Sequence, residues 1–260
     1  MELNLKDKRV LVTGGDGGLG SAIAKAFAAE GARVAINYRG KPDAADRLVA
    51  DFEARGGAAL AVPADVTDAG AIEKMFARLD EAWGGIDVLI NNAGVDGKPG
   101  KGWEIDVAAW AEVIDVNLKG AFLCAREALK RMVKQRSGVV INTSSVHEVI
   151  AWSGYSAYAA SKAGLSMLAK TLAQEAAPFG VRVLSIAPGA IKTPINRAVW
   201  SDPKGLEDLN AKIPFGRMGT PEEIAGMAVV LASDVASYVT ATSLFVDGGM
   251  TDYPDFAHGG

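Results

Sequence analysis

The chain of 260 residues contains a single cysteine, Cys124, and two histidines. One cysteine cannot form an internal disulfide, and such a sequence suits the reducing cytoplasm. With only two histidines beside it, the chain cannot build a Cys/His zinc site. We therefore expect a cytoplasmic protein without a metal.

The sequence also lacks an excess of positive charge and a long apolar run. Lys and Arg number 27 and Asp and Glu number 31, which gives a net charge of −4 and no attraction to nucleic acid or an anionic membrane. The longest stretch without a charged residue, 149–161, is too short to span a bilayer. The first residues, MELNLKDKRV, lack the apolar core of a signal peptide. We expect neither a nucleic-acid partner nor membrane association.

Short apolar runs alternate with amphipathic segments along the whole chain. Strands are predicted at 9–14, 32–38, 58–65, 86–94, 138–145, 181–189 and 244–249, and helices at 43–56, 68–83, 104–136, 155–178 and after Thr220. This alternation predicts a single α/β domain, residues 1–260, with a Rossmann-like, doubly wound parallel sheet. Residues 190–219 lack clear periodicity, and we expect them to form a lid over the substrate.

A glycine-rich loop, TGGDGGLG, follows the first predicted strand and opens the first predicted helix. At such a helix start, free N–H groups and the positive end of the helix dipole can bind a pyrophosphate. The residues predicted to contact a dinucleotide here are Gly14, Gly17, Gly18, Leu19 and Gly20. The alternative is a tight turn that requires glycine and binds nothing.

The end of the second predicted strand bears on the choice of cofactor. Asn37, Tyr38 and Arg39 stand where a dinucleotide fold that prefers NAD carries an acidic residue. Without that carboxylate a 2′-phosphate is not repelled, and Arg39 could bind it, so NADP is expected in preference to NAD. Asp16 argues mildly the other way, and a solvated Arg39 is the alternative.

Four polar residues form a candidate catalytic group. Tyr158 and Lys162 share one face of a predicted helix at i, i+4 spacing, where the ammonium would favour the phenolate. Ser145 ends a predicted strand, and its hydroxyl could hold a substrate oxygen. Asn117, at a predicted helix start, could hold a water that relays protons. Taken alone, the Tyr–Lys spacing also fits an ordinary amphipathic helix.

Together TGGDGGLG, NNAG (91–94), Asn117, Ser145, YAASK (158–162) and PG (188–189) resemble the short-chain dehydrogenase/reductase family over nearly the full length. The resemblance implies a seven-stranded sheet, a homotetramer, and hydride transfer to or from a nicotinamide with Tyr158 as acid and base. It implies further cofactor contacts from Tyr38, Asp65, Val66, Asn91, Ala93, Gly94, Lys162, Pro188, Gly189, Ile191 and Thr193.

A narrower likeness is to bacterial glucose 1-dehydrogenases, a group within that family. It is carried by INYR (36–39), NNAGVD (91–96), SSVHE (144–148), TPIN (193–196), YVTATSLFVDGGMT (238–251) and YPDF (253–256). It implies oxidation of an aldose, D-glucose first, at C1 to the lactone with NADP or NAD. The chain departs from the group at 151–157 and at position 96, where Asp replaces Glu, so a sugar-like substrate is expected more firmly than glucose itself.

Several polar or aromatic residues are expected to contact this substrate: Asp96, Ser145, His147, Trp152 and Asn196. For His147 a hydrogen bond to the backbone is the alternative, and for Trp152 we expect a flat apolar face. The tail, 253–260, is expected to reach a neighbouring subunit's site.

Two other functions are open. An NADPH-dependent carbonyl reductase of 3-oxoacyl thioesters or steroids would suit a more apolar lid than KTPINR (192–197). A regulatory protein that binds a dinucleotide without turnover would fit the fold. Against it, all four catalytic positions are filled.

Overall fold

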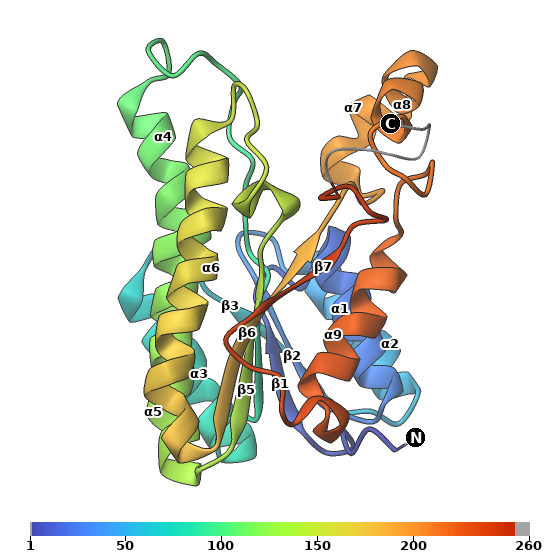
Figure 1. Ribbon diagram of the computed structural model, residues 1–260. Coiled ribbons are helices and arrows are strands. Elements are labelled where there is room, and N and C mark those ends of the chain that lie inside the picture. Colours follow the sequence, from blue (N-terminus) through green and yellow to red (C-terminus); the bar gives the residue numbers. More distant parts are fainter. Residues whose placement is uncertain (1, 253–260) are drawn as a thin grey trace.

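A parallel β-sheet forms the centre of the protein, whose residues 2–252 are described by a computed structural model (Figure 1). Within these residues seven strands lie in the order β3-β2-β1-β4-β5-β6-β7, and all neighbouring strands are parallel. The strands are β1 (Arg9–Val12), β2 (Arg33–Tyr38), β3 (Ala59–Pro63), β4 (Val88–Asn91), β5 (Gly138–Thr143), β6 (Val181–Pro188) and β7 (Ser243–Val246). The predicted Rossmann-like doubly wound domain is confirmed. The predicted contact of the tail, 253–260, lies outside the described residues.

Helices cover both faces of this sheet. They are α1 (Gly18–Ala29), α2 (Asp43–Ala54), α3 (Ala69–Trp83), α4 (Val107–Ile114), α5 (Ala121–Gln135), α6 (Ser156–Ala176), α7 (Arg197–Trp200), α8 (Pro203–Asn210) and α9 (Pro221–Ala232). In Figure 1, α1, α2 and α9 lie on one face, and α3, α5 and α6 lie on the other. Over the described range, no helix is both long enough and apolar enough to cross a membrane.

The strands are apolar almost throughout because both faces are buried. Val10 and Val12 of β1 belong to one hydrophobic cluster with Phe27 of α1, whereas Leu11 belongs to a second cluster with Phe76 of α3. Successive side chains of a strand point to opposite faces, so a strand between two helical layers needs no polar positions.

Local signals set several helix starts. Thr220 Oγ1 accepts a hydrogen bond from the N–H of Glu223, and Glu223 Oε2 accepts one from the N–H of Thr220. This is the capping box that TPEE predicts. At the start of α3, the Asp68 carboxylate accepts from the N–H groups of Gly70 and Ala71.

The helical segment predicted at 104–136 contains a π-helical turn, η1 (Asp115–Gly120), between α4 and α5. Asn117 lies inside this turn, so its predicted place at a helix start is wrong. The helix begins at Val107, where Asp106 Oδ1 accepts from the N–H of Ala109, and the wider π turn lets the chain run on into α5.

Residues 190–219 contain short helices despite their lack of apolar periodicity: the 3-10 turn η4 (Pro194–Asn196), α7 and α8. Asn196 Oδ1 accepts from the N–H of Thr193, and its Nδ2 donates to the carbonyl of Ile191. Trp200 Nε1 donates to the carbonyl of Thr193 at 2.9 Å. Local polar bonds order this segment, and its role as a lid stays a prediction.

Candidate active site

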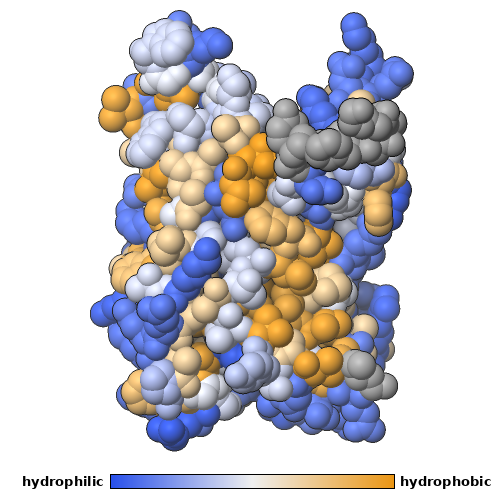
Figure 2. Space-filling model, in the orientation of Figure 1, coloured by the Kyte–Doolittle hydropathy of each residue, from blue (hydrophilic) through white to orange (hydrophobic). Residues whose placement is uncertain are grey.

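The candidate site lies where β1, β4, β5 and β6 end at the same edge of the sheet. The connections diverge between β1 and β4, and such a switch point forms a crevice in doubly wound sheets. Figure 2 shows the surface hollowed between the side formed by α4 and α6 and the side formed by α7 and α8.

The glycine loop approaches its neighbours too closely for side chains at some positions. A Cβ on Gly20 would lie 2.2 Å from the carbonyl oxygen of Gly14 and 2.6 Å from Asn92 Nδ2. Gly14 itself has a φ of +58°, a conformation that favours glycine. These two glycines are therefore required by close packing and by backbone conformation.

The beginning of α1 is open to a ligand. Around an added Cβ on Gly17 or Gly18, nothing described in residues 2–252 lies within 4 Å. In the same range, no side chain caps the first N–H groups of α1, and no acidic residue stands in its first turn. Leu19 packs against the hydrophobic cluster beneath. Free N–H groups beside open space are what a pyrophosphate requires.

Two residues that the sequence analysis did not single out hold this loop in place. Thr13 Oγ1 accepts from the N–H groups of Asn92 and Ala93, at 2.9 and 3.0 Å. Asn92 Nδ2 donates to the carbonyls of Thr13 and Gly14. Their signal in the sequence is a short polar side chain at a strand end that faces the glycine turn.

The ends of β2 and β3 carry a loose ion pair. Arg39 Nη1 lies 3.7 Å from Asp65 Oδ2, and the Arg39 side chain is 62% exposed. Hydrogen bonds from Thr67, together with Arg39, hold the pKa of Asp65 below its ordinary value. Asn37 is buried and accepts from the N–H of Gly14, so it braces the loop. Arg39 is therefore an exposed and loosely paired cation at this edge of the predicted adenosine site.

Two residues near this ion pair pack against apolar side chains. Tyr38 packs against the hydrophobic cluster on the α1 side. Val66 is buried, and its Cγ2 would lie 2.9 Å from a Cβ on Gly120. Both stand at strand ends beside the predicted adenosine site.

The NNAG turn contributes mainly its backbone. The Asn91 side chain points into the protein, where Nδ2 donates to Asn142 Oδ1 and to the carbonyl of Ala121. A Cβ on Gly94 would lie 3.3 Å from Asn117 Oδ1 and 3.7 Å from Lys162 Nζ. The turn therefore passes directly over two of the predicted catalytic residues.

The structure brings Ser145, Tyr158 and Lys162 together. Lys162 is buried, its Nζ donates to the carbonyl of Thr143 at 2.8 Å, and it lies 5.5 Å from the centre of the Tyr158 ring. Ser145 lies close enough to the Tyr158 hydroxyl to lower its pKa. Ser145 is in turn fixed by the N–H of His147, which donates to its Oγ.

Burial decides the protonation of this group. It raises the pKa of Tyr158 to about 12, although the nearby Ser145 hydroxyl acts in the opposite direction. It lowers the pKa of Lys162 to about 8, while the charges of Asp96 and Glu148 act to raise it. In the protein alone, burial therefore outweighs the lowering of the Tyr158 pKa that we expected from the ammonium. With a pKa of about 12 Tyr158 is protonated at neutral pH, and with a pKa of about 8 Lys162 still carries most of its charge there.

Asn117 has its side chain fully engaged. Oδ1 accepts from the N–H of Val95, and Nδ2 donates to the carbonyl of Val95 and to Ser161 Oγ. The side chain thus ties η1 to the loop after β4 and to α6. A water relay at this residue would have to use a backbone group that the π turn frees.

Three aromatic rings form a stack beside Tyr158. The His147 ring lies 4.4 Å from Trp152 at 15°, and the Tyr155 ring lies 3.8 Å from Trp152 at 23°. At these distances the rings of His147 and Tyr155 would overlap if they lay on the same face of the indole. They therefore cover opposite faces. These two rings cover much of the flat surface that Trp152 was expected to offer, and its contact with a substrate stays a prediction.

His147 and Asp96 face the same space. Nδ1 of His147 lies 3.0 Å from the carbonyl of Ile150, so Nδ1 carries the proton. Burial lowers the pKa of His147, which leaves Nε2 as an acceptor at neutral pH. The hydrogen bond to the backbone, the alternative stated above for His147, is therefore present. Burial raises the pKa of Asp96, while the charges of Lys162 and His147 lower it.

The segment after β6 holds the last predicted contacts. Pro188 ends β6 beside Val246, and a Cβ on Gly189 would lie 2.8 Å from Asp247 Cα. Ile191 forms a β-bridge with Gly219 and is buried. Asn196 Oδ1 accepts from Thr193 in a capping box, and its Nδ2 donates to the carbonyl of Ile191, so the amide orders the segment.

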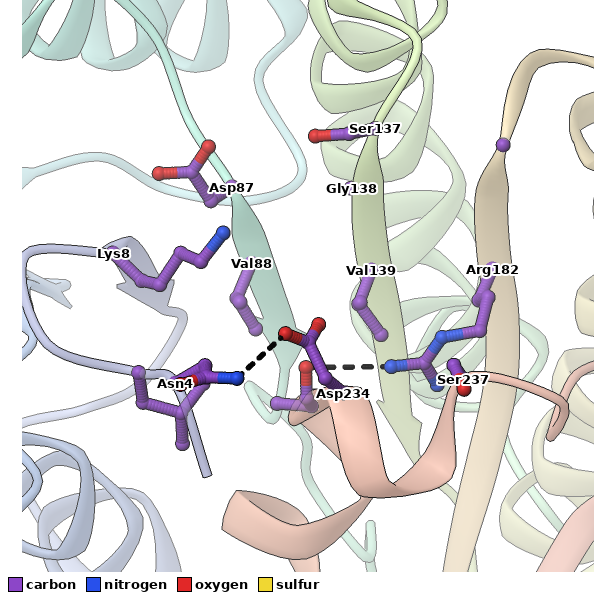
Figure 3. Close-up of a pocket in the computed structure, with 13 residues that line it drawn as sticks. Asn4, Lys8, Asp87, Val88, Ser137, Gly138, Val139, Arg182, Asp234 and Ser237 are labelled. Carbon is purple, nitrogen blue, oxygen red and sulfur yellow. Dashed lines mark hydrogen bonds between the residues drawn. The ribbon is translucent and has the colours of Figure 1, made fainter. Parts of the chain in front are cut away.

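A cavity of about 220 Å³ lies at the other end of the sheet, beside the first residues of β4 and β5 (Figure 3). Arg182, which lines it, donates to four backbone carbonyls, two in the last turn of α9 and two in the segment between α9 and β7. Asp234 accepts from Asn4, and Asp87 is paired with Arg9. Because these charges are satisfied within the protein, we assign no ligand to this cavity.

Comparisons with known proteins agree on the kind of fold and chemistry. A family model described as enoyl-(acyl carrier protein) reductase matches residues 14–251. The chain is 48% identical over 258 residues to 3beta-hydroxysteroid dehydrogenase 1 of Eggerthella lenta, with 98% of both chains covered. It is 41% identical over 255 residues to glucose 1-dehydrogenase 2 of Bacillus subtilis, with the same coverage. A gluconate 5-dehydrogenase from Burkholderia cenocepacia, solved in complex with NADP and tartrate, superposes with a TM-score of 0.92 at 32% identity, covering 96% of this chain and 98% of that chain.

Proposed function

Because this chain belongs to the short-chain dehydrogenase/reductase family, we propose that it interconverts an alcohol and a carbonyl compound with a nicotinamide cofactor. The observation that carries the proposal is the convergence of Ser145, Tyr158 and Lys162 beside the open, uncapped start of α1. Gly17 and Gly18 would hold the pyrophosphate there, and the bound nicotinamide would supply or accept the hydride.

The protein's own residues would handle the oxygen and its proton. Ser145 donates a hydrogen bond to the substrate oxygen and stabilises charge that develops on it. Tyr158, protonated at neutral pH, donates its proton to that oxygen during reduction and recovers one during oxidation. Lys162 stabilises the phenolate that this transfer leaves.

We propose NADP as the preferred cofactor, with NAD as a second. The exposed guanidinium of Arg39 stands at the end of β2, and its partner Asp65 lies 3.7 Å away, a loose contact that a phosphate could replace. The NADP in the structure of the Burkholderia relative supports the same preference.

For the substrate we propose an alcohol on an apolar ring system, of the steroid kind. Two residues predicted to hold sugar hydroxyls are partly or fully engaged: the amide of Asn196 and one nitrogen of His147. Val149 and Trp152 near the site, and Val199 on α7, expose apolar surface. The 48% identical relative is named for a 3beta-hydroxysteroid, which supports this choice.

An aldose oxidised at C1 is the second candidate. Asp96 and the free Nε2 of His147 are two acceptors near Tyr158, and a sugar could donate its hydroxyls to them. The 41% identical glucose 1-dehydrogenase supports this reading.

Absorbance at 340 nm separates the candidates. Purified protein would be mixed with NADP⁺ or NAD⁺ and either a 3β-hydroxysteroid, D-glucose or another aldose. A specificity constant for the steroid well above that for every aldose supports the first candidate, and the reverse order supports the second. Turnover only of 3-oxoacyl thioesters with NADPH would overturn both. Cofactor binding without turnover of any alcohol or carbonyl would indicate a regulatory protein.

We also propose a homotetramer. All four residues of the edge strand β7 are partly exposed, and hydrophobic surface gathers over β7 and α9 in Figure 2. An open edge with apolar surroundings suits burial against a second subunit. Light scattering coupled to size-exclusion chromatography measures the mass, and a monomer would contradict the proposal.

A further inference from the structure

The carboxylate of Glu148 lies between the turn that carries Ser145 and the helix that carries Tyr158 and Lys162. Its Oε1 accepts a 3.1 Å hydrogen bond from Ser166 Oγ. Ser166 is buried and follows Lys162 by four residues, as Lys162 follows Tyr158. At this spacing the three residues form one row along α6, so Glu148 contacts the same helix face that holds the catalytic pair.

A polar row on the sheet supports this contact. Ser166 Oγ lies 3.2 Å from Ser243 Oγ of β7. Ser243 is in register with Ser185 of β6, and Ser185 with Asn142 of β5. Two buried oxygens of the cluster, Glu148 Oε2 and Ser185 Oγ, have no hydrogen-bond partner among the described residues. The contact between Glu148 and α6, called the anchor below, therefore rests on few hydrogen bonds. If the bond from Ser166 were lost, no other bond would replace it.

We propose that Glu148 is a positioning residue that fixes Ser145 against the face of α6 carrying Tyr158 and Lys162. The effect of this positioning on turnover rests on the proposed function. The short turn η2 (Val146–Glu148) transmits the effect: the N–H of Glu148 donates to the carbonyl of Ser145 at 3.0 Å, and the N–H of His147 donates to Ser145 Oγ. A displacement of Glu148 therefore displaces the Ser145 hydroxyl.

The same carboxylate acts on the charge of Lys162. Burial lowers the pKa of Lys162 to about 8, and the negative charges of Asp96 and Glu148 act to raise it. Asp96 comes from the loop after β4 and Glu148 from η2, while Tyr158 and His147 are the other titratable neighbours. Removal of the Glu148 charge would therefore move the Lys162 pKa further down.

Three variants separate the hydrogen bond from the charge. Glu148→Gln removes the charge and keeps an oxygen that can accept from Ser166. Ser166→Ala keeps the charge and removes the donor. Glu148→Ala removes both. Glu175→Gln, at an exposed position of the same helix, is the matched control.

The first measurement needs no substrate. Hydrogen–deuterium exchange of a peptide spanning 144–150 reports the amides of η2, whose protection falls when the anchor is lost. We expect faster exchange in Glu148→Ala and Ser166→Ala and unchanged exchange in Glu175→Gln. Unchanged exchange in the first two would overturn the anchoring. If the wild-type protein turns over no alcohol or carbonyl, the proposed function fails, and this measurement still decides the inference.

The second measurement is the pH profile of turnover. A misplacement of catalytic groups by about 1 Å can cost about a hundredfold in rate, so we expect kcat of Glu148→Ala to fall by about that factor, with cofactor affinity kept. Glu148→Gln should keep most of the maximal kcat, while the limb that reports Lys162 moves to lower pH. If Glu148→Ala does not fold, Glu148→Gln and Ser166→Ala still carry the test. Wild-type kcat in Ser166→Ala together with an unshifted limb in Glu148→Gln would refute the role of Glu148.

Discussion

Alanine at Gly20 should damage both the stability of the protein and its affinity for the cofactor. The new Cβ would lie 2.2 Å from the carbonyl oxygen of Gly14, more than 1 Å inside an ordinary contact. It would also lie 2.6 Å from Asn92 Nδ2, which donates to the carbonyls of Thr13 and Gly14. A backbone atom cannot rotate away, so the loop itself must move.

The magnitude follows from these contacts. Overpacking costs about 1–3 kcal/mol, and each of the two hydrogen bonds of Asn92 contributes about 1 kcal/mol. The higher helix propensity of alanine returns about 1 kcal/mol. A net loss of about 2–4 kcal/mol in a chain of this size lowers Tm by roughly 4–16 °C.

Two other glycines serve as matched controls. An added Cβ on Gly17 or Gly226 meets nothing described within 4 Å, so neither substitution should reduce Tm. Gly226 lies inside α9, away from the loop, and its alanine variant should keep full cofactor affinity. Gly17 stands at the open start of α1, where a side chain would obstruct a pyrophosphate.

Thermal unfolding by circular dichroism and a fluorescence titration with NADPH test the three variants at one protein concentration. Gly20→Ala should lose in both, Gly17→Ala in affinity alone, and Gly226→Ala in neither. Gly20→Ala with wild-type Tm would refute the packing argument. Gly17→Ala with wild-type affinity would refute the site of the pyrophosphate.

Three further predictions concern the catalytic and cofactor residues. Tyr158→Phe should remove nearly all turnover while the NADPH titration stays unchanged, and retained turnover would exclude Tyr158 as the proton donor. Arg39→Ala should weaken NADPH by about tenfold or more and leave NADH nearly unchanged, because a charged hydrogen bond contributes about 1.5–3 kcal/mol; equal losses for both cofactors would contradict a 2′-phosphate contact. Lys162 has a pKa of about 8 in the folded protein against 10.5 ordinarily, so the unfolded state binds more protons between these values and stability should rise from pH 8 to 10.5. Above pH 10 the raised pKa of Tyr158 acts in the opposite direction, because there the folded state binds more protons. Urea unfolding across this range measures both effects, and a rise that persists in Lys162→Met would assign it to another group.

The sequence predicted the fold well because the information is local. Apolar runs of strand length, glycines at a strand end and the TPEE capping box each act over a few residues, and all agree with the structure. It predicted less well where order comes from irregular polar contacts. The short helices between 190 and 219 depend on Asn196 and Trp200, whose partners no periodicity reveals.

By itself the sequence determined the doubly wound sheet, the glycine loop and the spacing that places Tyr158 and Lys162 on one helix face, because these follow from alternation and helical periodicity. Only the tertiary structure decided what those groups experience. Burial reverses the expected pKa shift of Tyr158, and stacking by His147 and Tyr155 covers both faces of Trp152. It also brings Glu148 against Ser166, 18 residues along the chain. Desolvation and side-chain contacts depend on which distant segments meet, and a linear pattern does not record that.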